Sequence, residues 1–199
     1  MVTQTKPPLP PVSVARLPLR RFTVDEYYAM AEAGILKKED RVELIDGVIV
    51  AMAPIGNRHL ATVDRFTRMF GEGVGRRAIV RVQGSITLDD HTMPEPDLVL
   101  LRERADFYES DSAGPEDVLL IVEVADSSVD YDRNEKLLRY AQAGIPEVWI
   151  GVLPERIIEA YTEPAGGRYT LKRIFSPGDT ITPGCFPDIA LNVDRILPS

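Results

Sequence analysis

Three acidic residues stand within or directly before apolar stretches of the chain. Glu123 interrupts the apolar run of residues 119–125, Asp97 immediately precedes the run of residues 98–101, and Glu43 lies between two apolar neighbours. Burying an unpaired carboxylate is costly, so each acid is expected to have a cation, a hydrogen-bond donor or a raised pKa. An arginine partner, or exposure on the polar side of an amphipathic sheet, would satisfy the same pattern.

The chemistry that such acids can perform is the binding of a hard divalent cation. If the apolar runs are neighbouring strands of one sheet, Asp97 and Glu123 converge on a site lined by oxygen atoms, and Glu43 can add a further carboxylate. Mg²⁺ takes one or two carboxylates and completes its shell with water or substrate phosphate. Lys136, thirteen residues after Glu123, would add a positive charge, although a solvated helix lysine is the commoner explanation of that pattern.

Other catalytic and binding classes have little support in the sequence. The chain has one cysteine, Cys185, and two histidines, His59 and His91, so it cannot assemble a disulfide framework or a Cys/His zinc cage. It has no Gly-x-Ser-x-Gly elbow for a nucleophilic triad. The glycine-rich stretch of residues 71–75 lacks the preceding strand and the Lys-Ser/Thr pair of a phosphate-binding loop.

The composition suits one domain with a hydrophobic core. The 199 residues are 44% hydrophobic and carry 23 Lys and Arg against 31 Asp and Glu, a formal net charge of -8. This balance argues against bulk attraction to nucleic acid or anionic lipid, but allows a local cation site. The longest apolar stretch, residues 48–55, is far short of the about 20 residues of a membrane helix. Because no secretory pattern is seen either, we expect a cytoplasmic protein without a membrane partner.

Proline and capping residues define the first elements. Five prolines among residues 1–18 predict a flexible arm, followed by a single domain over residues 19–199. Thr23 and Glu26 have the spacing of a capping box, in which each side chain accepts a hydrogen bond from the other residue's backbone amide. They predict a short helix that runs to about Ala33.

A mixed sheet flanked by helices follows from the rest of the pattern. The Asp46-Gly47 pair predicts a hairpin with a type I′ turn over residues 41–52. A helix over residues 57–70 is expected to bury a face that includes Leu60 and to be closed by glycines. Further expected elements are strands at 78–82, 85–88, 98–101, 118–124, 148–153, 157–161 and 168–175, a helix over 132–143 and a C-terminal segment near 189–196. The runs at 98–101 and 118–124 are typical of strands covered on both faces, and the fold class is α/β (α+β).

Several short pieces of the chain, taken in order, carry a family resemblance. They are Glu43-Leu44-Ile45-Asp46-Gly47, His59, Pro96-Asp97, Val122-Glu123-Val124, Lys136 with Tyr140, and Glu147-Val148-Trp149-Ile150. In this order and spacing they resemble the Uma-type putative restriction endonucleases, a bacterial group within the PD-(D/E)XK nuclease superfamily. The similarity covers nearly the whole chain after the arm.

The resemblance implies a restriction-endonuclease-like fold, a mixed central sheet flanked by helices with β-hairpin additions at the N-terminal and C-terminal ends. It also implies a catalytic site formed by Asp97, Glu123, Lys136 and Glu43, in which the three acids are metal ligands. Ala125 stands where the superfamily's Glu-x-Lys motif has its lysine. Lys136 on the next helix is therefore expected to replace that lysine.

The implied activity is the hydrolysis of DNA phosphodiester bonds, with Mg²⁺, or Mn²⁺ as a substitute, as cofactor. A homodimer is expected by analogy with nucleases that cut both strands. His59 is a possible auxiliary base or phosphate contact, and Tyr140 a hydrogen-bond partner of the site, although either residue could equally be structural. The acidic charge and Ala125 leave open an alternative, a catalytically inactive member of the same fold that acts as a binding or assembly module.

Overall fold

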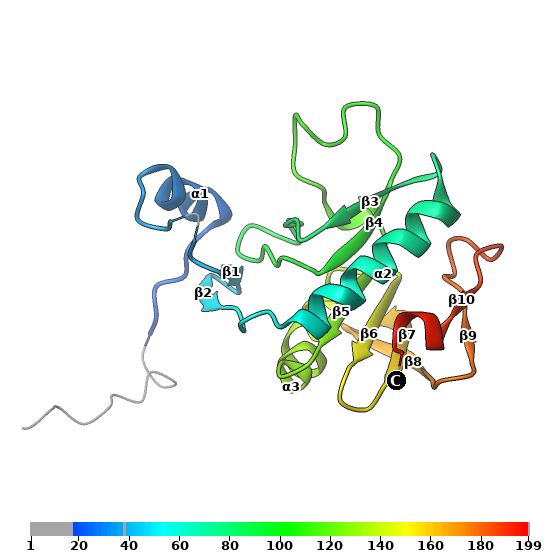
Figure 1. Ribbon diagram of the computed structural model, residues 1–199. Helices are drawn as coiled ribbons and strands as arrows, with labels where there is room; N and C mark the ends of the chain where they lie inside the picture. The colour runs from blue at the N-terminus through cyan, green and yellow to red at the C-terminus, as the bar shows by residue number, and fades with distance from the viewer. Residues whose placement is uncertain (1–17, 38, 199) are drawn as a thin grey trace, which may run out of the picture.

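A six-stranded mixed sheet forms the centre of the computed structural model, which describes residues 18–37 and 39–198 (Figure 1). Its strand order is β3-β4-β5-β6-β7-β8, and every neighbouring pair is antiparallel except β5 and β6. The strands are β3 (Ala78–Val82), β4 (Leu98–Arg102), β5 (Val118–Ala125), β6 (Glu147–Val152), β7 (Ile157–Ala165) and β8 (Arg168–Phe175). The predicted mixed sheet and its strand-helix-strand unit, β5 to β6, are confirmed. The predicted arm lies outside the described residues, apart from Pro18.

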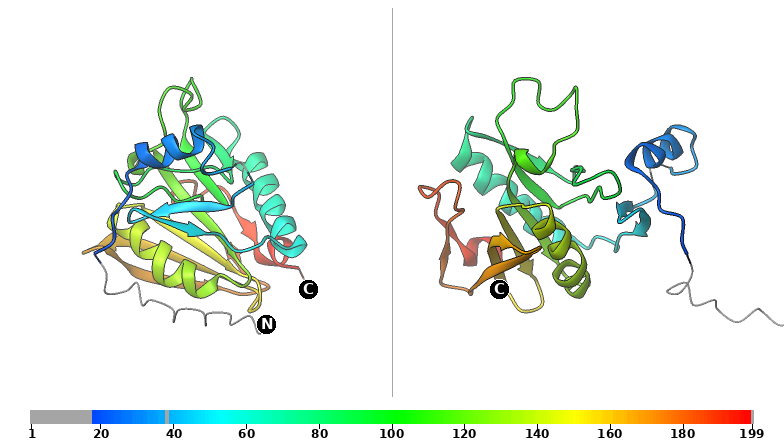
Figure 2. Two further views of the ribbon diagram at one scale, coloured as in Figure 1. Left: turned by 90° about the vertical axis from the view of Figure 1, so that its left-hand side faces the viewer. Right: turned by 180° about the vertical axis from the view of Figure 1, so that it is seen from behind.

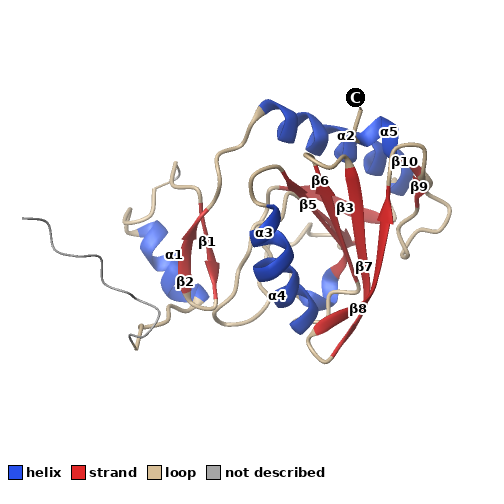
Figure 3. Cartoon of the chain, turned by 90° about the horizontal axis from the view of Figure 1, so that it is seen from below, coloured by secondary structure: helices blue, strands red, loops and turns tan. Residues whose placement is uncertain are grey.

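Helices cover both faces of this sheet (Figure 3). One face carries α2 (Asn57–Val74), and the other carries a continuous helical segment made of α3 (Val129–Tyr131), the π-helical turn η3 (Asp132–Lys136) and α4 (Leu137–Gln142). None of the helices in the described part of the chain is long and apolar enough to cross a membrane. The remaining elements are α1 (Val24–Glu32), β1 (Val42–Ile45), β2 (Val48–Ala51), the 3-10 turn η2 (Pro115–Asp117), β9 (Thr180–Ile181), β10 (Leu191–Asn192) and α5 (Val193–Ile196).

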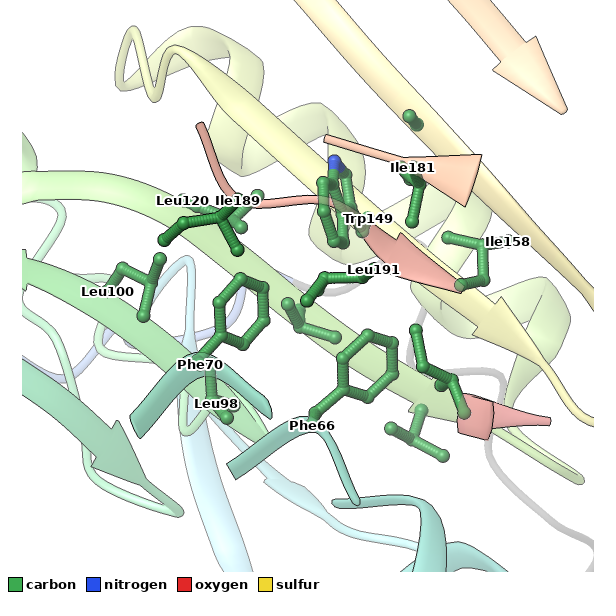
Figure 4. Packing of buried hydrophobic residues seen from close by; sticks show 14 of the residues in the cluster. Phe66, Phe70, Leu98, Leu100, Leu120, Trp149, Ile158, Ile181, Ile189 and Leu191 are labelled. Carbon is green, nitrogen blue, oxygen red and sulfur yellow. The ribbon is translucent and has the colours of Figure 1, made fainter. Parts of the chain in front are cut away.

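The central strands are buried on both faces, as their apolar runs predict. Alternate residues of β4 and β5 point to opposite sides, so Leu100 packs under α2 while Val99 packs under α4. On the α2 side, Phe66, Phe70 and Trp149 are fully buried (Figure 4). The ring centroids of Phe70 and Trp149 lie 5.7 Å apart. This packing fixes α2 over the sheet, and with it the first turn of α2 near the ends of β4 and β5.

The predicted end and face of α2 need correction. The helix runs to Val74 rather than residue 70, since two of the glycines expected to close it lie within it and Gly75, at φ +56°, is the C-cap. Leu60, expected on the apolar face, is 43% exposed. The buried face is formed instead by Thr62, Val63, Phe66, Phe70 and Val74. With 3.6 residues per turn, Leu60 falls beside this face rather than on it.

The strand predicted at residues 85–88 is wrong. The segment is extended, and Ile86 and Leu88 donate backbone hydrogen bonds to Pro94 and Thr92 at 3.1 and 2.9 Å, but it joins no sheet. Its partner segment contains two prolines, which have no amide hydrogen to donate, so a ladder cannot continue along it. The helix predicted over residues 132–143 begins earlier, at residue 129, and contains the π turn, which α-helical periodicity does not announce.

Two N-terminal elements project from the main body of the molecule (Figure 2). The predicted capping box of α1 is confirmed, because the amide of Glu26 donates to Thr23 Oγ1 at 3.2 Å and the amide of Thr23 donates to Glu26 Oε2 at 3.1 Å. The predicted type I′ hairpin is confirmed by the positive φ of Asp46 (48°) and Gly47 (71°). Strands β1 and β2 form their own two-stranded sheet, as β9 and β10 do near the C-terminus.

Gly47 is the tightest point of this hairpin. A Cβ on Gly47 would lie 2.6 Å from Arg21 Cβ and 2.9 Å from the carbonyl oxygen of Phe22, and its φ is +71°. We therefore expect Gly47→Ala to lower the free energy of unfolding by about 1–3 kcal/mol, from the left-handed backbone and the clash together. Urea denaturation measures this loss.

Gly34 provides the matched control for that substitution. It has the same φ, +71°, but a Cβ there would meet no atom within 4 Å. Gly34→Ala should therefore lower the free energy of unfolding by about 1 kcal/mol, from the left-handed backbone alone. Equal losses for the two variants would contradict a steric role of Gly47.

Candidate active site

A cavity opens where β4 and β5 meet the N-terminal hairpin. It measures about 350 Å³, and its lining includes Glu43, Glu95, Asp97, Glu123, Asp132 and Lys136. All four residues predicted to be catalytic, Asp97, Glu123, Lys136 and Glu43, therefore line one cavity, together with His59. Tyr140 does not line it but contacts Glu123 from behind.

The sheet register brings Asp97 and Glu123 together. Strands β4 and β5 pair antiparallel with Leu98 opposite Val122, so Asp97, immediately before β4, lies across from Glu123. One oxygen of Asp97, Oδ2, accepts a hydrogen bond from the backbone amide of Val124 at 2.8 Å. The same oxygen lies 3.0 Å from His59 Nε2, on the first turn of α2. The Asp97 side chain is thus held by β5 on one side and α2 on the other.

Lys136 is the buried cation of the site. Its Nζ lies 3.1 Å from Glu123 Oε1 and 3.3 Å from Glu43 Oε2, and it donates a long hydrogen bond, 3.5 Å, to the carbonyl oxygen of Glu95. The Lys136 side chain is only 6% exposed. Burial opposes the charge, but the surrounding carboxylates outweigh it and raise the pKa of Lys136 above its usual value. Lys136 is therefore protonated and neutralises buried acids.

Glu123 occupies the most enclosed position among the acids. It is 3% exposed, and burial raises the pKa of its carboxyl group, an effect that the Lys136 ammonium opposes. Its Oε1 accepts from Lys136 and also from the Tyr140 hydroxyl at 2.6 Å. Tyr140 follows Lys136 by one helical turn, so both donors come from the same face of one helical segment. The pair holds Glu123 in a single orientation.

Glu43 is fixed by donors at both of its oxygens. Oε1 accepts a hydrogen bond from the Tyr131 hydroxyl at 3.0 Å, and Oε2 accepts from the backbone amide of Glu95 at 3.1 Å and faces Lys136. The hairpin that carries Glu43 is tied to the domain by backbone hydrogen bonds between Leu44 and Met93, at 2.7 and 3.3 Å. Glu43 therefore links the hairpin to Lys136, and each of its carboxylate oxygens already faces a donor.

A metal ion would have to be held by fewer than three side chains. Within residues 18–37 and 39–198, no three Asp, Glu, His or Cys side chains lie close enough together to surround one. In the same part of the chain, Asp97 Oδ1 and Glu123 Oε2 accept no hydrogen bond, whereas their partner oxygens accept two each. Two hard oxygen atoms from adjoining strands fit Mg²⁺, which keeps several waters and binds through one or two carboxylates.

Three cavity residues escaped the sequence analysis. Asp132 is 4% exposed, accepts a hydrogen bond from Ser128 Oγ at 2.7 Å, and has its pKa raised to about 6, chiefly by burial. Tyr131 contacts Glu43, and Glu95 contributes backbone atoms as well as a carboxyl group whose pKa is raised by burial. The signal for Glu95 was its place between two prolines beside Asp97. Tyr131 and Asp132 looked like ordinary helix-start residues, and no pattern marked them.

Comparisons with known proteins identify a family and a similar fold. The model of the family Uma2, described as "putative restriction endonuclease", matches residues 24–194. Among solved structures, the crystal structure of a putative nuclease belonging to DUF820 from Anabaena variabilis ATCC 29413 is similar, with a TM-score of 0.68 and 17% sequence identity over 88% of this chain and 97% of that chain. At this identity the likeness shows the fold. No curated protein matches the chain.

Proposed function

Since the chain belongs to the Uma2 family of putative restriction endonucleases, we propose that it is a magnesium-dependent endonuclease that hydrolyses phosphodiester bonds of DNA. One observation carries the proposal beyond the family's general class. Asp97 and Glu123 meet across β4 and β5 with one oxygen each facing no donor in the described residues, and the buried Lys136 stands beside them. Two carboxylates that can hold a cation, beside a lysine, are suited to metal-assisted phosphodiester hydrolysis.

Asp97 and Glu123 are the proposed metal ligands. A bound divalent cation polarises a phosphoryl oxygen and lowers the pKa of a bound water. The amide of Val124 and the ring of His59 orient Asp97, while Lys136 and Tyr140 orient Glu123. Both ligands are thus fixed by neighbours before substrate arrives, which reduces the reorganisation needed during the reaction.

Lys136 has two proposed roles. It offsets the charge of Glu123 and Glu43, and it stabilises negative charge that develops on the phosphate in the transition state. Its longest contact is the 3.5 Å hydrogen bond to the Glu95 carbonyl. The N–H group that makes this contact is the one most readily redirected to a phosphate of the substrate. Glu43 positions Lys136 in this proposal. The sequence-based assignment of Glu43 as a metal ligand has less support, because both of its oxygens already face donors.

His59 is proposed to position Asp97 rather than to act as a base. Its Nε2 faces Asp97 Oδ2 at 3.0 Å, and its Nδ1 is buried without a hydrogen-bond partner in the described residues. Because Nε2 contacts the proposed ligand Asp97 and Nδ1 is buried, the geometry favours a positioning role for His59 over that of a base.

We propose a homodimer for cutting both strands, by analogy with other nucleases. By sequence alone, the apolar strands after Trp149 are candidates for its interface. Ile150 and Val152 of β6 are instead at most 1% exposed within a single chain. A dimer would have to use other surfaces.

One observation favours the alternative, a non-catalytic binding or assembly module. The Lys136 ammonium has three N–H groups and already faces Glu123, Glu43 and the Glu95 carbonyl. A lysine held in this way could serve only to neutralise buried acids. Metal binding and cleavage, measured separately, distinguish the two functions.

The test uses the purified full chain with supercoiled plasmid, linear duplex and single-stranded DNA, in EDTA, Mg²⁺ or Mn²⁺. We expect cleavage only with a metal, and saturable Mn²⁺ binding by calorimetry that Asp97→Asn removes. Asp188→Asn is the control, because Asp188 is exposed and pairs with Arg77 away from the cavity. Metal binding without cleavage of any DNA form would support the module, and the absence of both would overturn the metal site itself.

A further inference from the structure

Three arginines converge on a second hollow next to the candidate active site. Arg58 and Arg65 of α2 and Arg156 of the β6–β7 turn line a space of about 330 Å³ together with Leu153 and Leu197. We call this the arginine pocket. Within residues 18–37 and 39–198, no aspartate or glutamate lines it, and none of the three arginines forms an ion pair. A chain with an excess of acids has here a local concentration of positive charge.

Most donors of these arginines have no acceptor in the described residues. Each guanidinium carries five N–H donors. Arg58 Nη2 donates to the carbonyl oxygen of Leu153 at 2.6 Å, and Arg156 Nη2 donates to that of Leu197 at 3.2 Å. Arg156 Nε is buried without a partner, and Arg156 is held in the left-handed region at φ 55°. Backbone carbonyls thus orient two guanidinium groups. The remaining N–H donors of these groups have no acceptor in the described residues.

The arginine pocket adjoins the candidate active site along two paths. Arg58 and His59 are consecutive residues of α2, and His59 contacts Asp97. In the sheet, Leu153 follows β6 and its amide donates to the carbonyl of Ala125 at 2.9 Å, at the end of β5 that leads into the cavity. The C-terminal α5, which carries Leu197 at its end, lies beside α2 (Figure 3). The first turn of α2 therefore contributes to the lining of both sites, His59 to the cavity and Arg58 to the arginine pocket.

The first turn of α2 adds to the positive potential between them. Its N-cap, Gly56, lies in the cavity wall and makes no side-chain cap, and the turn contains no acidic residue. Free amides at the start of an 18-residue helix favour an anion. This end of α2 supports the site only together with the three arginines.

The geometry points to the binding of a backbone phosphate of DNA in the arginine pocket, next to the phosphate that is cleaved. Guanidinium groups match phosphate oxygens with paired N–H donors, and arginine is the side chain best suited to such contacts. The inference rests on the proposed nuclease function for its choice of DNA. It also accounts for DNA binding by a chain of net charge -8, because contact is made where positive charge is concentrated.

The test measures DNA affinity without catalysis. Binding of a fluorescein-labelled mixed-sequence duplex is followed by anisotropy in EDTA, at several salt concentrations, for the wild type, Arg58→Gln, Arg65→Gln and Arg156→Gln. Each substitution is expected to weaken binding about 3–10-fold regardless of DNA sequence and to reduce the slope of log affinity against log salt by up to about 1. Inorganic phosphate should compete with the DNA in the wild type and less so in the variants.

Arg76→Gln is the matched control, because it causes the same change in net charge. Arg76 is exposed just beyond the C-terminal end of α2 and forms no ion pair in the described residues. Variants of the pocket that bind DNA with the affinity and salt slope of Arg76→Gln would overturn the inference, as would a wild type that binds no duplex at low salt. Thermal unfolding checks each fold, and the exposed Arg58 provides a test even if Arg156→Gln is unstable. Pocket-dependent binding without cleavage would uphold this inference while the proposed activity fails.

Discussion

Replacement of Lys136 by methionine is expected to abolish metal-dependent cleavage and to lower the free energy of unfolding by about 3–5 kcal/mol in the absence of metal. Methionine matches the length of the lysine stem but removes the charge. Glu123 and Glu43, 3.1 and 3.3 Å from Lys136 Nζ, would then face each other in a buried site without a counter-charge. The loss arises from these stranded acids, so Mn²⁺ should restore part of the stability.

Lys172→Met is the control for this prediction. Lys172 also pairs with a buried acid, Glu159, at 2.6 Å, but its side chain is 41% exposed and Glu159 retains hydrogen bonds from Arg133 and Tyr161. The Lys172→Met substitution should lower the free energy of unfolding by about 0–1 kcal/mol. Chemical denaturation with and without Mn²⁺ measures both variants. Equal losses for the two lysines, or full cleavage activity in Lys136→Met, would show that Lys136 has no special place in the site.

Asp97→Asn is expected to reduce metal-dependent cleavage by about 10²–10⁴-fold, which corresponds to about 3–5 kcal/mol of lost transition-state stabilisation. Asparagine keeps an oxygen that can accept the hydrogen bond from the Val124 amide. The start of β4, which directly follows residue 97, should therefore stay in place. It is a weaker metal ligand because it carries no charge. The fold should therefore persist while the affinity for the cation falls.

Single-turnover cleavage and the thermal unfolding midpoint, measured on the same preparation, separate these effects. Asp188→Asn carries the same change of charge on an exposed residue that is paired with Arg77, and should cleave at the wild-type rate. An Asp97→Asn protein that cleaves as fast as this control would exclude Asp97 as a ligand. A protein that has lost both activity and its unfolding transition would show that Asp97 is needed for the fold, and His59→Gln would then test the same contact from the other side.

Hydrophobic pattern and turn chemistry were enough to predict most of the fold. The apolar runs around Leu100 and Ile121 require burial on both faces, and such strands lie at the centre of a sheet flanked by helices. Positive φ at Asp46 and Gly47 could be predicted because few residue types adopt it. The failure at residues 85–88 shows the limit of this reasoning, since a strand requires a partner able to donate hydrogen bonds.

The candidate site could be predicted only in part, for a different physical reason. The closeness of Asp97 and Glu123 follows from the pairing of consecutive strands, which is the commonest arrangement in a sheet. The acids that surround Lys136, Glu123 and Glu43, are brought there by contacts between segments far apart in the sequence. One such contact is that of Glu43 with Tyr131. Such contacts are set by tertiary packing, and no local periodicity encodes them. The open Nη donors of Arg58 and Arg156 were likewise invisible until the turn and the helix were seen together.

The π turn at Asp132–Lys136 has a genetic consequence. A π turn contains one more residue than the α-helical turn it replaces. Loss of a single codon between Asp132 and Lys136, in frame, would remove the extra residue and let an unbroken α-helix form, while the turns on either side kept their orientation. The same loss from an ordinary α-helix would rotate its two sides by about 100° relative to each other. Tyr131 and Tyr140 would therefore stay with Glu43 and Glu123, and such a gene could lose one residue here without dismantling the site.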